Sequence, residues 1–171
     1  MREFIDIIER LCKKLNLQIN IMEVCGTHTV SIFRHGIRSL IPSNIKLLSG
    51  PGCPVCVTPI EDVDRMLYIA RQRDIILTTF GDMMRVPGSN GSLYKTKAEG
   101  ADIRIVYSPL DALGIAENNK NKKVIFFAVG FETTSPLIAA TLFEADRKNV
   151  ENFYIYSVHK LVPPALEVLV N

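Results

Sequence analysis

The sequence predicts an α/β fold, with an open parallel sheet of about four strands in residues 1–118 and the start of a second, similar α/β domain in residues 119–171. Three observations lead to this prediction. The hydrophobic pattern changes repeatedly between helical spacing and short apolar runs. The short runs are apolar along both faces, which is typical of parallel strands covered by helices. The two kinds of segment also alternate along the chain, as βαβ units require.

A first helix is expected over residues 4–15, where apolar residues recur at helical spacing. Six strands are expected at residues 19–24, 45–49, 75–79, 103–107, 124–129 and 153–156. Helices are expected between the strands. Two of them have a start signal in which a hydroxyl residue is the expected N-cap and a proline follows it, at Thr58–Pro59 and at Ser108–Pro109. At the first of these, Glu61 is expected to close a capping box with Thr58.

The polar stretch at residues 117–123 is the predicted domain boundary, because it contains asparagines and lysines and no apolar pattern. Only two strands follow it, and residues 169–171 stop within an apolar helical pattern. We therefore expect a truncated or split protein. The alternative is one compact domain in which all six strands share a sheet.

The composition excludes several classes of protein. Among 171 residues, 47% are hydrophobic and 22% are charged, as in soluble globular proteins. The net charge of +2 is too small to indicate binding to nucleic acid or to an anionic membrane. The first 15 residues resemble neither a secretory signal nor a membrane span. The chain is therefore expected in the cytoplasm, with its cysteines reduced and available for metal or redox chemistry.

The unusual motifs follow the predicted strands. Because parallel strands end at one edge of a sheet, these loops are expected to converge on one crevice. The loops are Cys25–His28, Gly50–Cys56, Phe80–Gly88, Gly130–Thr134 and Ser157–Lys160.

Three of the four cysteines lie in these loops. Cys25 falls between a strand and a helix start, where backbone N–H groups favour a thiolate that can act as nucleophile or metal ligand. His28 lies one helical turn away and is a candidate ligand beside Cys25, although a capping or packing role also explains it. Cys53 and Cys56 form a CxxC motif, which is typical of redox dithiols and of half a zinc site, with a structural turn as the alternative. Cys12 lies on an apolar helix face and is assigned no chemistry.

Charged residues follow two other strands. Asp82 and Arg85 are candidates to pair with each other or to hold a charged partner loop. Glu132 ends a very apolar strand, where a carboxylate is costly unless it has a partner or a function, and a function is favoured. Capping of the next helix explains Thr133–Thr134 more simply. His159–Lys160 is a weaker candidate, because a solvated helix start also explains it.

Taken in order, the motifs resemble the HypD family of hydrogenase maturation factors. The resemblance rests on Cys25–His28, Gly50–Cys56, Thr79–Gly88 and Gly130–Thr134. It covers essentially the whole chain and corresponds to about the N-terminal half of the family pattern.

The resemblance implies a scaffold with thiol redox activity, rather than a conventional turnover enzyme, on which the Fe(CN)₂CO unit of [NiFe]-hydrogenases is assembled. It implies a HypC-type chaperone and a HypE-type cyanide donor as partners. By motif, Cys25 is the iron thiolate with His28 close to it, and Cys53 and Cys56 are the redox dithiol. Thiolate ligands suit an iron that carries cyanide and CO.

One departure concerns the family's [4Fe–4S] cluster. Its cysteine ligands lie in the C-terminal part of the family pattern, and this chain has no cysteine beyond Cys56. A second chain supplying the remainder is therefore expected among the partners. Two other functions stay open: a zinc module using a Cys₃His set, and a thioredoxin-like dithiol oxidoreductase using Cys53 and Cys56 alone.

Overall fold

The computed structural model describes residues 2–15 and 17–170, and it confirms an α/β fold with parallel strands. The chain divides into two compact units, Met1–Cys56 and Val57–Asn171. Each unit is described by itself. None of the helices within the described residues is long and apolar enough to cross a membrane.

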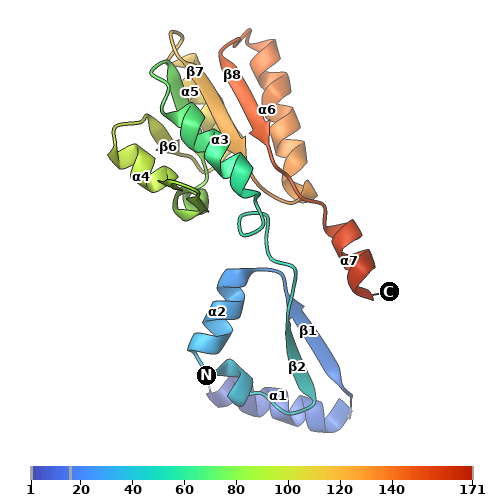
Figure 1. Cartoon of the computed structure of the whole chain (residues 1–171). Coiled ribbons are helices and arrows are strands. Elements are labelled where there is room, and N and C mark those ends of the chain that lie inside the picture. The colour runs from blue at the N-terminus through green and yellow to red at the C-terminus, as the bar shows by residue number, and fades with distance from the viewer. Residues whose placement is uncertain (1, 16, 171) are drawn as a thin grey trace. The chain divides into compact units, whose positions relative to one another are not determined.

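The first unit is a small βαβ arrangement (Figure 1). Its elements are α1 (Arg2–Leu15), β1 (Ile19–Glu23), α2 (Gly26–Arg34), the 3₁₀ turn η1 (Ile37–Ser39) and β2 (Ile45–Ser49). The two strands pair in parallel, with Ile19 opposite Ile45 and Glu23 opposite Ser49. Their carboxyl ends therefore lie side by side at one edge of the sheet.

The apolar residues of α1 form two stripes. Cys12 is 5% exposed, which confirms its predicted burial, and Ile5 and Ile8 beside it are half-buried. The residues of the other stripe are exposed: Phe4, Ile7, Leu11 and Leu15. The first unit therefore buries only part of the apolar face that the sequence pattern indicates.

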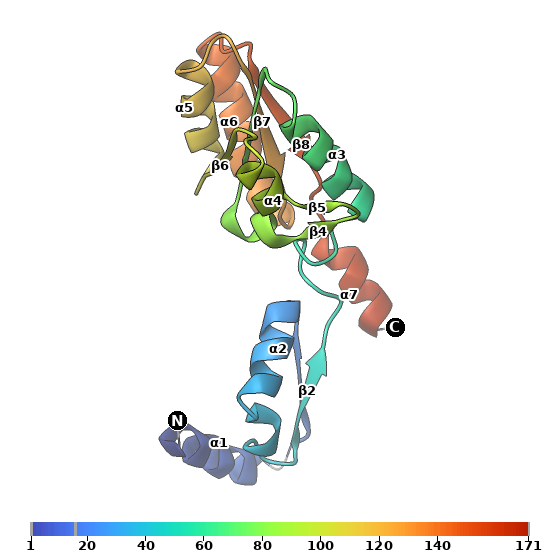
Figure 2. The ribbon, with the colours of Figure 1, turned by 60° about the vertical axis from the view of Figure 1, so that its left-hand side comes forward.

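The second unit contains a four-stranded parallel sheet in the order β6–β3–β7–β8. Its elements are α3 (Ile60–Ala70), β3 (Ile75–Thr79), η2 (Gly81–Arg85), β4 (Pro87–Gly88), β5 (Gly91–Ser92), α4 (Leu93–Ala98), β6 (Ile103–Ile105), α5 (Pro109–Glu117), β7 (Lys123–Ala128), η3 (Glu132–Thr134), α6 (Ser135–Arg147), β8 (Phe153–Ser157) and α7 (Val162–Val170). Helices α5 and α6 lie on one face, and α3 lies on the other (Figure 2). The strand order reverses between β3 and β7, so the loops after these strands flank the switch point of the sheet.

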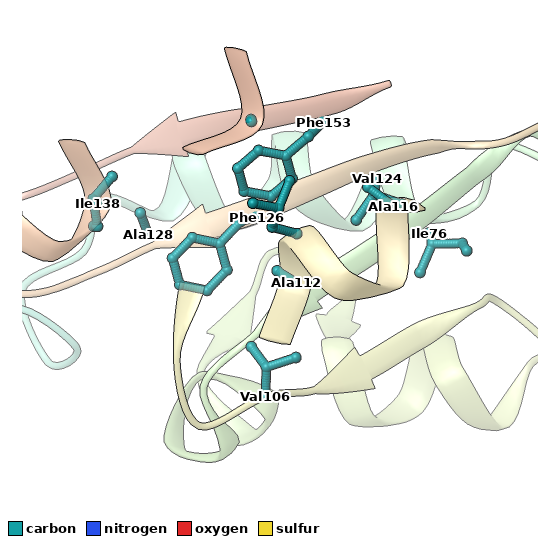
Figure 3. Packing of buried hydrophobic residues seen from close by; sticks show 11 residues of the cluster. Ile76, Val106, Ala112, Ala116, Val124, Phe126, Ala128, Ile138 and Phe153 are labelled. Atoms are coloured by element: carbon teal, nitrogen blue, oxygen red, sulfur yellow. The ribbon is translucent and has the colours of Figure 1, made fainter. Parts of the chain in front are cut away.

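One buried hydrophobic cluster of the second unit lies between the sheet and helices α5 and α6. Figure 3 shows Phe126 of β7 and Phe153 of β8 facing the small side chains Ala112 and Ala116 of α5. The alanines let the helix approach the sheet closely. Phe126 is fully buried, and its ring meets Phe80 edge to face with 5.4 Å between the ring centroids.

The division into units differs from the predicted boundary near residue 118. Strand β7 lies between β3 and β8, so residues 75–79 and 103–105 share a sheet with residues 123–128 and 153–157. The single six-stranded sheet is not formed either, because β1 and β2 make a sheet of their own. The stretch at 117–123 connects α5 to β7 within one unit. A polar surface turn and a polar linker have the same composition, and only strand pairing distinguishes them.

Asn152 fastens this turn to the start of β8. Its side-chain amide donates to the carbonyls of Ala116, Asn119 and Lys122 at 2.9–3.1 Å. We expect Asn152→Ala to lower the free energy of unfolding of the second unit by about 1–3 kcal/mol, because three hydrogen bonds to partly buried carbonyls are lost. Chemical denaturation checks this value. Asn121→Ala in the same turn is the control and should change stability by less than about 0.5 kcal/mol.

The two predicted helix start signals had different outcomes. At α5, Ser108 is the N-cap and Pro109 follows it, as expected from the sequence, and Asp111 completes a capping box that was not predicted. At α3, the prediction of Thr58 as N-cap is wrong, because the helix begins at Ile60 and its N-cap is Pro59. Pro59 has the extended backbone of an N-cap, with φ −56° and ψ 140°. It therefore stands just outside the helix, and Thr58 lies one residue too early.

Candidate thiol site

The three candidate thiols all belong to the first unit and follow its two strands. Cys25 comes two residues after β1 and is the N-cap of α2, with φ −137° and ψ 122°. Cys53 and Cys56 lie in the loop after β2. Because β1 and β2 are parallel neighbours, both loops leave the same edge of the sheet. The predicted convergence of these two motifs is therefore present within this unit.

The loop after β2 holds its two sulfurs close together. Gly52 has φ +95°, a left-handed conformation that glycine adopts without strain, and it turns the chain just before Cys53. The Cys53 thiol lies 3.3 Å from the sulfur of Cys56. The Cys56 sulfur also lies 3.5 Å from where a Cβ atom at Gly26 would be, so it rests against the first turn of α2. The four cysteines are free thiols.

Glu23, the last residue of β1, connects the two cysteine loops and is not among the residues predicted from the motifs. Its carboxylate accepts hydrogen bonds from the Thr29 hydroxyl in α2 at 2.5 Å and from the Gly50 N–H at 3.2 Å. The Gly50 N–H also donates to the Glu23 carbonyl at 2.8 Å. These contacts lower the pKa of Glu23, with the Thr29 bond as the largest cause. In the sequence, the only feature that could have indicated Glu23 is its position two residues before Cys25.

Cys25 and Cys53 have pKa values shifted in opposite directions. The backbone N–H of His28, followed by that of Thr27, lowers the pKa of Cys25 against a smaller opposing effect of burial. The Cys25 side chain makes no capping hydrogen bond, so these N–H groups stabilise the Cys25 thiolate chiefly through their dipoles at the start of the helix. Burial raises the pKa of Cys53. At neutral pH, Cys25 therefore has the stronger thiolate character of the two.

Alkylation rates should show this difference. In a Cys12→Ala, Cys56→Ser background, the pH midpoint for iodoacetamide labelling should lie below the ordinary thiol value at Cys25 and above it at Cys53. The sign follows because a lowered pKa yields thiolate at lower pH and a raised pKa delays it. Mass spectrometry of the separate tryptic peptides measures both midpoints. Equal midpoints would contradict the account of this site.

His28 lies in α2 with its side chain exposed. Its backbone N–H donates to the carbonyl of Cys25 at 2.9 Å, so its close link to Cys25 runs through the main chain. Within residues 2–15 and 17–170, no group of three or more His, Cys, Asp or Glu side chains is arranged to hold a metal ion. In this structure the described side chains therefore do not assemble a Cys₃His set.

The charged candidates Asp82, Arg85 and Glu132 belong to the second unit and follow the neighbouring strands β3 and β7. Asp82 accepts a hydrogen bond from the Met83 N–H at 3.0 Å at the start of η2, and Arg85 ends that turn. Glu132 accepts a hydrogen bond from the N–H of Val162, the first residue of α7, at 3.0 Å. The start of α7 thus provides a structural partner for this carboxylate.

His159 is held between two hydroxyl groups. The Thr134 hydroxyl donates to the Phe131 carbonyl at 2.8 Å, so toward His159 Nε2 at 2.9 Å it can only accept. Nε2 therefore carries the proton, and Nδ1 accepts from the Ser157 hydroxyl at 2.7 Å. Burial lowers the pKa of His159, which favours this neutral form. The Lys160 N–H donates to the Gly130 carbonyl at 2.9 Å, so these residues fasten the loops after β7 and β8 to each other.

Comparison with known protein families supports the resemblance seen in the motifs. The HypD family model, described as "Hydrogenase formation hypA family", matches residues 1–171. The chain belongs to the HypD family. The hydrogenase maturation factor HypD of Escherichia coli is 51% identical over 153 residues, which cover 90% of this chain and 41% of that protein. The putative hydrogenase expression/formation protein of Methanocaldococcus jannaschii is 44% identical over 171 residues, which cover 100% of this chain and 47% of that protein.

Another HypD relative, hydrogenase maturation factor HypD2 of Bradyrhizobium diazoefficiens, is 51% identical over 147 residues. These residues cover 85% of this chain and 39% of that protein. The chain thus spans less than half the length of each of these three relatives. All four motifs that carry the resemblance lie within the matched family region.

Proposed function

We propose that this HypD-family chain acts in the cytoplasm in [NiFe]-hydrogenase maturation, as part of a scaffold on which the Fe(CN)₂CO unit is assembled. The observation that carries the proposal is the convergence of three thiols from two neighbouring loops in the first unit. Family membership and the names of the relatives supply the hydrogenase context.

The iron unit is the cargo, and Cys25 is its proposed thiolate ligand. The lowered pKa of Cys25 favours the deprotonated sulfur that a metal requires. An iron that arrives with cyanide and CO needs few donors from the protein, and soft thiolates suit it. His28 is proposed as a neighbouring donor, which would require its exposed imidazole to turn toward the iron.

Cys53 and Cys56 are proposed as the electron source. Closing their disulfide would release two electrons and two protons. Ferric iron bound at Cys25 is the proposed acceptor and takes one electron to become ferrous, so one disulfide reduces two equivalents of iron. Their sulfurs lie 3.3 Å apart, so a small movement brings them to bonding distance. Asp82, Arg85 and Glu132 are proposed to serve the same assembly from the loops of the second unit.

The proposed partners are a HypC-type chaperone, a HypE-type cyanide donor and a polypeptide equivalent to the rest of the longer relatives. The [4Fe–4S] cluster implied by the family does not fit the described residues of this chain. Cys12 is buried in α1, and three thiols remain at the site. No step is therefore derived through that cluster.

Metal content tests the proposal against its alternatives. The chain is produced anaerobically with a HypC-type partner, purified and analysed for iron and zinc. The scaffold predicts iron in near-stoichiometric amount. Stoichiometric zinc without iron would contradict it and favour the zinc module, while a metal-free chain with full dithiol activity would favour the oxidoreductase.

A further inference from the structure

Glu23 occupies an unusual position, because one carboxylate contacts both segments that carry thiols. One oxygen accepts from the Thr29 hydroxyl, in the helix whose N-cap is Cys25. The other oxygen accepts from the N–H of Gly50, which opens the loop containing Cys53 and Cys56. The Glu23 carboxylate therefore adds a side-chain link to the strand pairing, at the point where both loops leave β1 and β2.

The approach of Gly50 to Glu23 is also unusually close. A Cβ atom at Gly50 would collide with the Glu23 carbonyl oxygen and would crowd the side chain of Met22. The residue there must be glycine for the main chain to donate to Glu23 at 2.8 Å. The loop therefore starts from a fixed point on β1, and the same residue fixes α2 through Thr29.

We infer that Glu23 is a positioning residue that sets the separation between the Cys25 loop and the Cys53–Cys56 loop. The geometric claim stands on these contacts alone. Its consequence for iron and electron transfer rests on the proposed function.

Two cysteine pairs can measure this separation. With Cys12→Ala and Cys56→Ser, the remaining thiols Cys25 and Cys53 report the distance between the loops. With Cys12→Ala and Cys25→Ser, the remaining pair Cys53 and Cys56 reports the geometry inside one loop. Each full-length chain is equilibrated in glutathione buffers, where oxidised glutathione takes up the two electrons and two protons released by the thiols. The equilibrium constant for each disulfide gives the effective concentration of its thiols.

Glu23→Ala should lower the effective concentration of the Cys25–Cys53 pair by about tenfold or more, because disulfide geometry tolerates little displacement. Glu23→Gln and Thr29→Val, which each remove part of the link, should lower it less. The Cys53–Cys56 pair should stay within about twofold of its parent in all three variants.

Asn44→Ala is the matched control. The Asn44 side chain donates a hydrogen bond to the Leu17 carbonyl at 2.9 Å. This bond joins the segments that precede β1 and β2, at the amino ends of the strands and away from the cysteine loops. If Glu23→Ala acted only by weakening the strand pair, Asn44→Ala would also lower the equilibrium constant of the Cys25–Cys53 disulfide. Positioning by Glu23 predicts that Asn44→Ala leaves it unchanged.

Three results would overturn the inference: failure of Cys25 and Cys53 to form a disulfide in the parent, an unchanged equilibrium in Glu23→Ala, or an equal loss in Asn44→Ala. Each concerns the positioning claim alone. Failure of the wild-type chain to retain iron would instead contradict the proposed function, so the two can be told apart.

Discussion

Replacing Cys25 with alanine should remove essentially all iron from the chain purified anaerobically with a HypC-type partner. Cys25 is the thiol placed at the start of α2, where N–H dipoles lower its pKa and favour metal binding. The alanine variant loses the ligand sulfur and keeps the dithiol. Iron content per chain, measured by elemental analysis, should fall to background.

Cys12→Ala is the control for this variant. It removes a thiol of the same unit that is buried in α1, away from the cysteine loops. It should retain iron at the level of the parent chain. Retention of iron by Cys25→Ala, or equal loss in both variants, would refute the role of Cys25.

Phe126→Ala should produce the largest loss of stability in the second unit, about 3–5 kcal/mol. Phe126 is fully buried at the centre of the core, where it contacts Phe80 and faces α5 (Figure 3). Removal of its ring leaves a cavity between sheet and helices that small alanines cannot fill. Native-state hydrogen exchange of the β7 amides measures the change within this unit.

Phe143→Ala makes the same chemical change on the outer face of α6, where the side chain is 77% exposed. It should change the protection of β7 by less than about 0.5 kcal/mol. A similar loss in both variants would show that the assignment of the core is wrong.

The sequence pattern was sufficient to locate the six strands of the parallel sheets, because each is a short apolar run between polar turns. It missed the antiparallel pair β4 and β5, whose two-residue strands are too short for any periodicity. It was insufficient for the domain boundary. The turn at 117–123 looks like a linker in sequence, and the pairing of β7 with both β3 and β8 depends on residues far apart in the chain. Strand partners are decided by tertiary packing, which periodicity does not encode.

The thiol site could be predicted only in part. Cys25, Cys53 and Cys56 were recognisable because the carboxyl ends of parallel strands share an edge. Glu23 was not, because a glutamate at a strand end is common and its partners, Thr29 and Gly50, are separated from it by 6 and 27 positions. Glu132 has a structural partner that the sequence pattern did not predict. A carboxylate after an apolar strand indicates a function, and in the structure it accepts a hydrogen bond from the N–H of Val162, 30 positions further along the chain.

Infrared spectroscopy tests the central claim most directly. The chain is produced anaerobically with HypC-type and HypE-type partners, and its spectrum is recorded in the region of metal-bound cyanide and CO. The scaffold predicts bands from bound cyanide and from bound CO. Only the cyanide bands should shift when the cyanide source carries ¹³C, and both kinds of band should vanish in Cys25→Ala. A wild-type chain that contains iron but shows neither band would contradict the account.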